Sequence, residues 1–223
     1  MGEHAQDHEF VSIASHELRT PISVVHGIAA TLHARHPDLD DQQVDALLAT
    51  LVQQTARLCE LADQLLDLSR LESEVEAERF RPRECLEELL PRVAAGRLDD
   101  VWLAVDPDYE LVADAVAFER VAANLIVNAL HHGEAPIEVR GERGERFRLV
   151  VEDHGEGVPA EFVPHLFEPF RRSDESRREG SPGAGLGLSI ASAYATALKG
   201  RLEYEDAQPR GARFTLSLPA ARS

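Results

Sequence analysis

Two long helical patterns fill the first third of the chain. The first runs from about residue 8 to 35, where apolar residues recur at the spacing of an α-helix. The side that we expect to be buried is marked by Phe10, Ala14, Val24 and Ile28. Residues 36–40 then supply a turn and an N-cap candidate for a second helix. Two helices joined by so short a turn form an antiparallel hairpin.

The second helix carries an unusually broad core stripe. Its core-type positions alternate in spacings of four and three, and three leucines widen the stripe. These positions are Val44, Leu48, Leu51, Thr55, Leu58, Ala62 and Leu65, with Leu47, Leu61 and Leu68 beside them. One partner helix cannot cover a stripe of this width, whereas two copies of the hairpin would bury it as a four-helix bundle. We therefore expect a homodimer whose core is built from both chains.

The pattern and the charge both change near residue 76. Residues 1–76 hold 4 of the 23 basic and 14 of the 40 acidic residues, which leaves 19 and 26 for the remainder. After a charged segment at 72–79, short apolar runs alternate with amphipathic stretches. Strand candidates are 101–105, 110–112, 137–141, 147–153, 201–204 and 213–218; helix candidates are 84–95, 115–131, a short one after Pro159, and 186–198.

The predicted fold class is α+β, with a helical hairpin followed by an α/β sandwich whose helices stack on one face of a sheet. The expected domains are 1–76 and 77–223. A chain of 223 residues with 43% hydrophobic content has room for both. The polar segment 171–183 is punctuated by glycine and proline and is expected to be a loop.

Composition excludes several classes of function. A net charge of −17 argues against binding nucleic acid or an anionic membrane through bulk electrostatics. No apolar run approaches the roughly 18 to 20 residues of a membrane span, and the N-terminus lacks the features of a signal peptide, so we expect a cytoplasmic segment. Cys59 and Cys85 lie in different predicted helices without metal-type spacing, which argues against a disulfide framework or zinc site.

One histidine stands on the polar side of the first helix. At helical spacing Ser12, His16 and Arg19 share a face opposite the apolar side, so the imidazole is expected to face water. Pro21 lacks an amide hydrogen and should bend the helix about one turn after the histidine. Taken alone, His16 is equally well interpreted as a solvated residue on a kinked helix.

Two asparagines on the predicted helix 115–131 offer oxygen ligands. Asn124 and Asn128 are four residues apart, so their side chains share one face and can present amide oxygens to one hard cation. Magnesium that bridges phosphates fits such a site. The alternative is that both asparagines are merely solvated or fill caps.

A carboxylate follows the strand candidate 147–153. Alternation places Asp153 on the inward face, where a buried carboxylate needs a hydrogen-bond donor, and the amino group of adenine is a natural one. Gly155 and Gly157 form a turn in which the backbone can approach a flat ligand closely. A sequence of this kind is also common in simple hairpin turns.

A glycine-rich turn opens the last predicted helix. Residues 183–188 precede its first turn, where unpaired amides and the helix dipole favour a phosphate. Arg172, in the loop before this turn, is one of several arginines placed to close over a triphosphate. A solvated run of charge explains each of these arginines equally well.

These motifs together resemble the two-component sensor histidine kinases. Residues 15–21 look like the H box of that family, and 124–129 like its N box. The G1, F and G2 boxes are matched by 153–157, 167–170 and 183–188 in the expected order. The resemblance spans nearly the whole chain.

The resemblance implies a role for each matching residue. His16 would be the phosphoacceptor, Glu17 the carboxylate that takes its proton, and Thr20 the group that positions water for dephosphorylating a partner. Asn124 and Asn128 would hold Mg²⁺. ATP would be bound through His131, Asp153, Gly155, Gly157, Phe167, Phe170, Arg172, Gly183, Gly185, Leu186 and Gly187, together with both asparagines. The implied partner is a response-regulator receiver domain that docks near His16.

The resulting hypothesis is an ATP-dependent histidine autokinase that passes its phosphoryl group to an aspartate of a receiver and also dephosphorylates that receiver. Two alternatives stay open. One is a degenerate dimeric scaffold that binds nucleotide weakly, and the other is an ATPase of the topoisomerase or chaperone type. His131, His154 and Ala184 depart from the residues common in the family, and histidine at 131 gives a phosphate less positive charge than lysine unless it is protonated.

Overall fold

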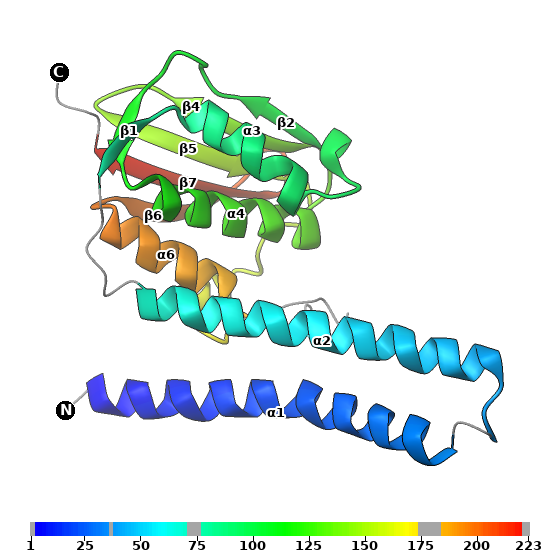
Figure 1. Cartoon of the computed structure of the whole chain (residues 1–223). Helices are drawn as coiled ribbons and strands as arrows, with labels where there is room; N and C mark the ends of the chain where they lie inside the picture. The colour runs from blue at the N-terminus through cyan, green and yellow to red at the C-terminus, as the bar shows by residue number, and fades with distance from the viewer. Residues whose placement is uncertain (1–2, 36–37, 71–76, 174–183, 220–223) are drawn as a thin grey trace. The chain divides into compact units, whose positions relative to one another are not determined.

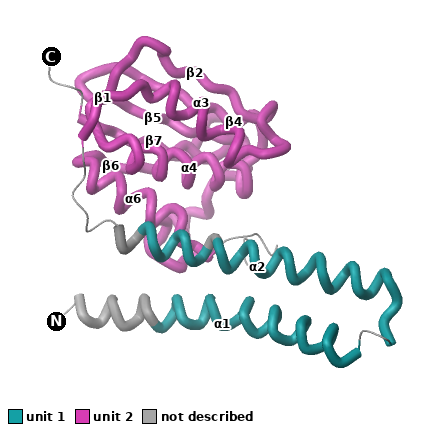
Figure 2. The backbone as a smooth tube through the Cα atoms, in the orientation of Figure 1, with its two compact units in different colours: residues 1–67 teal, residues 68–223 magenta. Residues whose placement is uncertain are grey.

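The computed structural model describes residues 3–35, 38–70, 77–173 and 184–219. The chain divides into two compact units, residues 1–67 and 68–223, shown in separate colours in Figure 2. The predicted boundary at residue 76 lies in the segment 71–76, outside the described residues, and stays a prediction.

The first unit is the predicted helical hairpin. It consists of α1 (Glu3–Arg35) and α2 (Asp41–Arg70). Asp40 caps α2 because its Oδ1 accepts from the Gln43 amide at 2.8 Å while Gln43 Oε1 accepts from the Asp40 amide at 3.1 Å. α1 continues through Pro21 as one helix, and its second half runs at a slant to the first (Figure 1). The reciprocal cap explains why the second helix begins where the sequence places it.

The side chains of the hairpin differ in one respect from the expected burial. Pro21 and Ile28 are buried, but Val24, which was expected on the buried side, is 38% exposed in the single chain. The reason is that Leu18, Pro21, Val25 and Ile28 continue the alternating spacing of three and four, which turns Val24 away from this side. Large apolar side chains stay exposed along both helices at Ile22, Val24, Leu48, Val52 and Leu66.

The second unit is the predicted α/β sandwich. Its elements are β1 (Glu78–Phe80), α3 (Pro82–Val93), η2 (Leu98–Asp100), β2 (Val101–Ala104), β3 (Leu111–Ala113), α4 (Ala115–His132), β4 (Ile137–Glu142), β5 (Arg146–Glu152), η3 (Val163–His165), α6 (Gly187–Ala197), β6 (Arg201–Asp206) and β7 (Ala212–Pro219). The main sheet has the order β2-β4-β5-β7-β6, parallel between β2 and β4 and antiparallel elsewhere. Figure 1 shows α3, α4 and α6 in one layer on a single face of this sheet, which confirms the predicted architecture.

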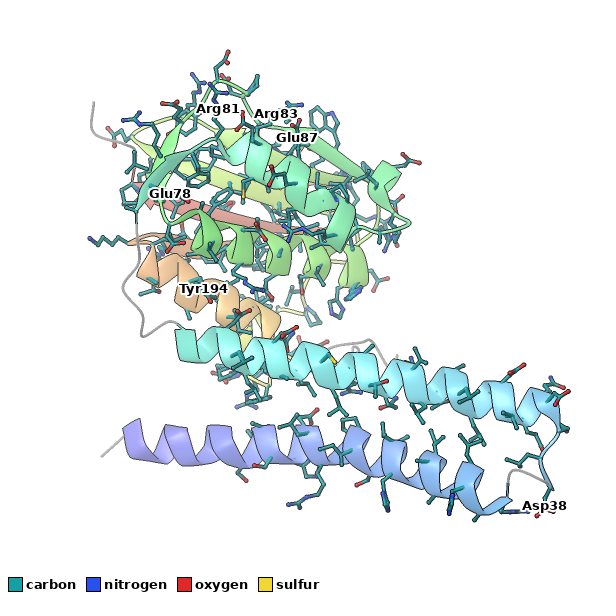
Figure 3. All side chains as sticks on the ribbon, viewed as in Figure 1. Asp38, Glu78, Arg81, Arg83, Glu87 and Tyr194 are labelled. Carbon is teal, nitrogen blue, oxygen red and sulfur yellow. The ribbon has the colours of Figure 1, made fainter. Side chains whose placement is uncertain are left out.

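The core lies between the sheet and this helix layer. Phe118 of α4 packs against Phe147 of β5 with ring centroids 6.3 Å apart, and Phe147, Leu149 and Val151 are all buried on the helix side of the strand. On α3, Arg83 ties the helix to the chain beyond β2 by donating to the Val105 carbonyl at 3.0 Å, and it pairs with Glu87 at 2.8 Å (Figure 3). The sheet and helices therefore form a rigid platform for the loops at their ends.

Two short elements differ from the sequence-based expectation. The segment 72–79 was expected to be a charged connection, but Glu78–Phe80 forms β1, antiparallel to β3. Phe80 anchors this strand because its ring lies 5.3 Å from that of Phe118. The short helix expected after Pro159 is a 3₁₀ turn, η3. None of the described helices combines the length and the apolar character needed to cross a membrane.

Candidate functional site

His16 is exposed on α1, as its position on the polar face predicts. Thr20, one turn later, is also exposed, and its hydroxyl donates to the His16 carbonyl at 3.3 Å. Glu17 is half-buried, and its Oε2 lies 3.5 Å from Nη2 of Arg57 on α2. The three H-box residues thus stand together on α1, with the imidazole accessible and the carboxylate held from the second helix.

In the second unit Asp153 is buried at the end of β5, with 3% of its surface exposed. Its Oδ1 accepts from the Gly155 amide at 2.9 Å and from the Ala212 amide at 3.3 Å. Burial raises the pKa of this carboxyl, and the two amide hydrogen bonds only partly oppose the effect. Among the described residues no hydrogen bond reaches Oδ2, so this oxygen of a largely buried side chain is open to a ligand.

Glycines crowd around this carboxylate for reasons that the sequence did not reveal. A Cβ on Gly133 would lie 2.3 Å from Asp153 Cγ, and one on Gly211 would lie 1.9 Å from the Asp153 carbonyl oxygen. Sequence reasoning missed both residues. The signals were a glycine directly after the asparagine helix and a glycine in the turn before the last strand.

Gly155 and Gly157 also serve the protein's own packing. A Cβ on Gly155 would lie 3.0 Å from the Cα of Gly133, and one on Gly157, at φ +80°, would lie 3.0 Å from the Gly211 carbonyl. These contacts explain both glycines without a ligand against their backbone. The expected close approach of a flat ligand at this turn stays a prediction.

The loop after Asp153 is fixed to the sheet by Tyr204. Its hydroxyl accepts from the Val158 amide at 3.1 Å and donates to Asp206 Oδ1 at 2.5 Å. Burial, together with the bond to Asp206, raises the pKa of Tyr204 to about 12, so the hydroxyl keeps its proton at neutral pH. Sequence reasoning did not single out this tyrosine.

Asn124 connects α4 to the start of α6. Its amide nitrogen donates to the Arg120 carbonyl at 2.8 Å, and its Oδ1 would lie 3.0 Å from a Cβ on Gly187, the first residue of α6. A larger residue at 187 would cover this oxygen. Asn128, one turn later, is half-buried, and His131 is exposed near the helix end. The Asn124 amide thus sits beside the glycine-rich turn, and hard oxygen donors of this kind suit Mg²⁺.

A backbone hydrogen bond joins the F motif to the G2 motif. The Phe170 amide donates to the Gly185 carbonyl at 2.9 Å. Gly185 has φ +75°, and a Cβ there would lie 2.6 Å from the Arg171 carbonyl and 3.1 Å from Arg172 Cγ. Phe167, Phe170 and Arg172 are half-buried. The structure therefore brings Phe170 and Arg172 to the turn before α6, whereas the placement of Phe167 against this turn stays a prediction.

Leu186 is buried and immediately precedes α6, whose first turn has no side-chain cap. The backbone amides of this first turn therefore have no capping side chain as acceptor and can bind a ligand. Gly183 lies outside the described residues. No group of three or more His, Cys, Asp or Glu side chains in the described ranges could hold a metal ion.

Two family models match the chain. Residues 6–74 match the His Kinase A (phospho-acceptor) domain, and residues 113–222 match the histidine kinase-, DNA gyrase B- and HSP90-like ATPase. The first covers the hairpin with His16, and the second covers the asparagines, Asp153 and the glycine-rich turn. The two kinds of motif found in the sequence therefore fall in two separately matched domains.

Curated relatives are sensor kinases. The chain is 33% identical to the sensor histidine kinase YkoH of Bacillus subtilis over 82% of its own length and 41% of that protein. It is 31% identical to the signal transduction histidine-protein kinase AfsQ2 of Streptomyces coelicolor over 98% of its length and 43% of that protein. The chain thus spans less than half the length of these relatives.

Solved structures agree in fold. The Acinetobacter baumannii histidine kinase AdeS superposes with a TM-score of 0.73 at 26% identity, over 93% of this chain and 98% of that one. The histidine kinase ThkA in complex with the response regulator TrrA gives 0.72 at 20% identity, over 96% and 61%. With both domains matched and in order, the chain belongs to the two-component sensor histidine kinases, as a phosphoacceptor hairpin joined to an ATP-binding domain.

Proposed function

We propose that this chain is an ATP-dependent autokinase that transfers the γ-phosphoryl group of ATP to its own His16. The observation that carries the proposal is one chain with two complementary sites. An exposed histidine stands beside a held carboxylate on the hairpin, and a buried Asp153 keeps one oxygen for a ligand in the ATP-binding fold.

The nucleotide would be held at both of its ends. Oδ2 of Asp153 would accept a hydrogen bond from the adenine amino group, because the carboxyl is largely buried and this oxygen has no donor among the described residues. The free amides at the start of α6 would bind phosphates, with the positive end of the helix dipole facing them. Arg172 supplies positive charge next to this turn.

The other residues that the resemblance assigns to ATP binding would complete the site. They are His131, Gly155, Gly157, Phe167, Phe170, Gly183, Gly185, Leu186 and Gly187. Asn124 and Asn128 would hold Mg²⁺, which neutralises phosphate charge when it is bound. The free Oδ1 of Asn124 beside Gly187 supports this assignment.

The chemistry needs a neutral imidazole and a base. One ring nitrogen of His16 would attack the γ-phosphorus, the bond to the β,γ-bridging oxygen would break, and ADP would leave with that electron pair. The proton on the other ring nitrogen would pass to Glu17, which stabilises the charge that develops on the ring. The accessibility of His16 on α1 suits a nucleophile that has to meet both ATP and a partner.

The phosphoryl group would then pass from His16 to an aspartate of a receiver domain. In a second, opposing activity, Thr20 would position a water molecule that hydrolyses the phosphoaspartate of the receiver. The solved ThkA structure, which contains a response regulator, supports such a partner by analogy of fold. A homodimer through the hairpin is part of this proposal, and the exposed apolar side chains of both helices support it.

Incubation with γ-labelled ATP and Mg²⁺ tests the proposal. We expect acid-labile, base-stable label on the wild-type chain and none on His16→Ala. Asp153→Asn should retain the fold but lose labelling, because the amide adds a donor where the adenine amino group needs an acceptor. Equal labelling of His16→Ala would refute the assignment of the phosphoacceptor.

The same assay separates the two alternatives. A degenerate scaffold would bind ATP weakly and take up no label, and no observation on the described residues favours it. An ATPase of the topoisomerase or chaperone type would release free phosphate without a phosphohistidine intermediate. The exposed His16 beside Glu17 and Thr20 favours the kinase over both.

A further inference from the structure

Arg57 of α2 is the ion-pair partner of Glu17. Nη2 of the arginine lies 3.5 Å from Oε2 of the glutamate, and 37% and 33% of the two side chains are exposed. No other ion pair involves this carboxylate within the described ranges. Both residues belong to the helical hairpin, so the contact lies within one compact unit.

Helix geometry makes the orientation of Glu17 important. Adjacent residues on an α-helix point about 100° apart, so His16 and Glu17 do not face each other directly. His16 is exposed, while Glu17 is half-buried and reached by α2. A carboxylate in this position needs a further contact to fix its direction, and the described structure supplies one from α2.

In the described structure no hydrogen bond joins the side chains of His16 and Glu17. Hydrogen bonds of catalytic groups are often long before the substrate is bound and tighten in the reactive complex. The ion pair with Arg57 is made through Oε2, and no hydrogen bond among the described residues occupies Oε1. A single long contact of this kind can orient the Glu17 carboxylate and still leave it able to accept a proton from His16.

Stability does not explain Arg57. A half-exposed ion pair contributes little to the free energy of folding because water screens it. In addition, Nε of Arg57 is buried without a hydrogen-bond partner, which costs free energy. Because Arg57 adds little to stability and lies beside the carboxylate proposed as the base, its presence at this position is better explained by a function.

We infer that Arg57 is a positioning residue for the phosphorylation of His16. It holds Oε2 of Glu17 so that Oε1 can accept the proton that leaves the imidazole during attack on the γ-phosphorus. The inference rests on the proposed autokinase function. It assigns to α2 a part of the reaction that the H box on α1 does not contain.

Initial rates of labelling against ATP concentration test the inference on the full chain. Positioned general bases contribute about 10²- to 10⁴-fold, so loss of orientation alone in Arg57→Ala should lower kcat about tenfold. The KM for ATP should stay within about twofold, because Arg57 belongs to the hairpin and binds no nucleotide in this account. Arg57→Lys keeps the charge and should restore kcat to within about threefold of wild type.

Two further variants distinguish positioning from a structural effect. Arg35→Ala removes an exposed arginine at the end of α1 and should leave both kinetic parameters unchanged. Glu17→Gln should make Arg57 irrelevant, so Glu17→Gln and Glu17→Gln with Arg57→Ala should label at equal rates. Thermal melts show whether each variant is folded at the assay temperature.

The outcomes are separable. An unchanged or raised kcat in Arg57→Ala, an effect confined to KM, or multiplicative losses in the double variant would overturn the role of Arg57 and leave the autokinase intact. A wild-type chain that takes up no label on His16 would refute the autokinase, and the role of Arg57 with it.

Discussion

Asp153 shows most directly how a single residue joins fold and function. Its carboxyl is buried, two backbone amides satisfy Oδ1, and Oδ2 keeps no partner among the described residues. The surrounding glycines are there because any side chain would collide with this residue or its neighbours. The glycines around Asp153 therefore leave room for its carboxyl and keep Oδ2 accessible to a ligand.

Gly133→Ala tests this arrangement. The added Cβ would lie 2.3 Å from Asp153 Cγ, so the carboxyl has to move, and overpacking of this kind costs about 1–3 kcal/mol. We expect a lower Tm and loss of ATP binding by calorimetry. Gly144→Ala is the matched control, since the nearest atom to its Cβ is 3.6 Å away, and it should change neither quantity. Wild-type affinity in Gly133→Ala would contradict the account.

Asp153→Asn tests the buried carboxyl through pH. Because its pKa is raised in the folded state, folding favours the protonated form, and this contribution is present at low pH and lost as the pH rises through the raised pKa. The asparagine in the variant does not titrate. We therefore expect the Tm of Asp153→Asn minus that of wild type to increase from about pH 4 to pH 7.

Thermal melts at several pH values in the absence of nucleotide provide this measurement. A Tm difference that is constant with pH would show that burial does not disfavour the charged carboxylate. At neutral pH the variant should be at least as stable relative to wild type as it is at low pH, although it no longer binds ATP.

At the scale of the element, the hairpin depends on where its second helix begins. Asp40 and Gln43 exchange side-chain to backbone hydrogen bonds, so two otherwise unpaired amides are satisfied before α2 starts. By fixing where α2 begins, this cap helps to determine which α2 residue lies opposite Glu17 of α1, and that residue is Arg57.

Asp40→Ala should lower the stability of the hairpin by about 1 kcal/mol, as loss of an N-cap commonly does. Asp38→Ala is the control, because Asp38 is exposed in the same turn and does not cap the helix (Figure 3). Denaturant melts followed by circular dichroism measure the difference. Equal midpoints for the two variants would show that the cap is dispensable.

At the scale of the whole molecule, the exposed apolar side chains predict assembly. Leu48 is 45% exposed, Val52 66% and Leu66 56%, and a helix that carries them is poorly suited to stand alone in water. A second copy of the hairpin would cover them and complete the four-helix bundle proposed from the sequence.

Leu48→Asp, at an exposed position of the predicted core stripe, should shift the protein from dimer to monomer, because one carboxylate from each chain would have to be buried in the interface. Sedimentation velocity over a range of concentrations measures the shift. Ala46→Asp, at an exposed position of the same helix outside the predicted core stripe, is the comparison and should dimerise more tightly than Leu48→Asp. A monomeric wild-type chain would contradict the prediction.

Much of the fold followed from local patterns. The long heptad-like stripe predicts the hairpin, and alternation predicts that Asp153 is buried, because both depend on fixed periods of 3.6 and 2 residues. β1 was missed, since three residues with only Phe80 packed inward give no periodic signal. Gly133 and Gly211 were missed because the atoms that exclude their side chains come from distant parts of the sequence.

The role of Arg57 likewise needed the structure. In the sequence it is one charged residue on a helix, 40 positions after Glu17, and only the turn between α1 and α2 decides which residues meet. The motifs identify the reacting groups, whereas the contacts that hold them are set by the way the helices and strands pack.

The central claim is that His16 accepts the γ-phosphoryl group of ATP. Phosphorus NMR and intact-protein mass spectrometry at neutral pH, after incubation with ATP and Mg²⁺, test it most directly. We expect a phosphoramidate signal and the mass of one added phosphoryl group on the wild-type chain, and neither on His16→Ala. A phosphoramidate that persists in His16→Ala, or a wild-type chain that binds ATP but gains no phosphoryl group, would contradict it.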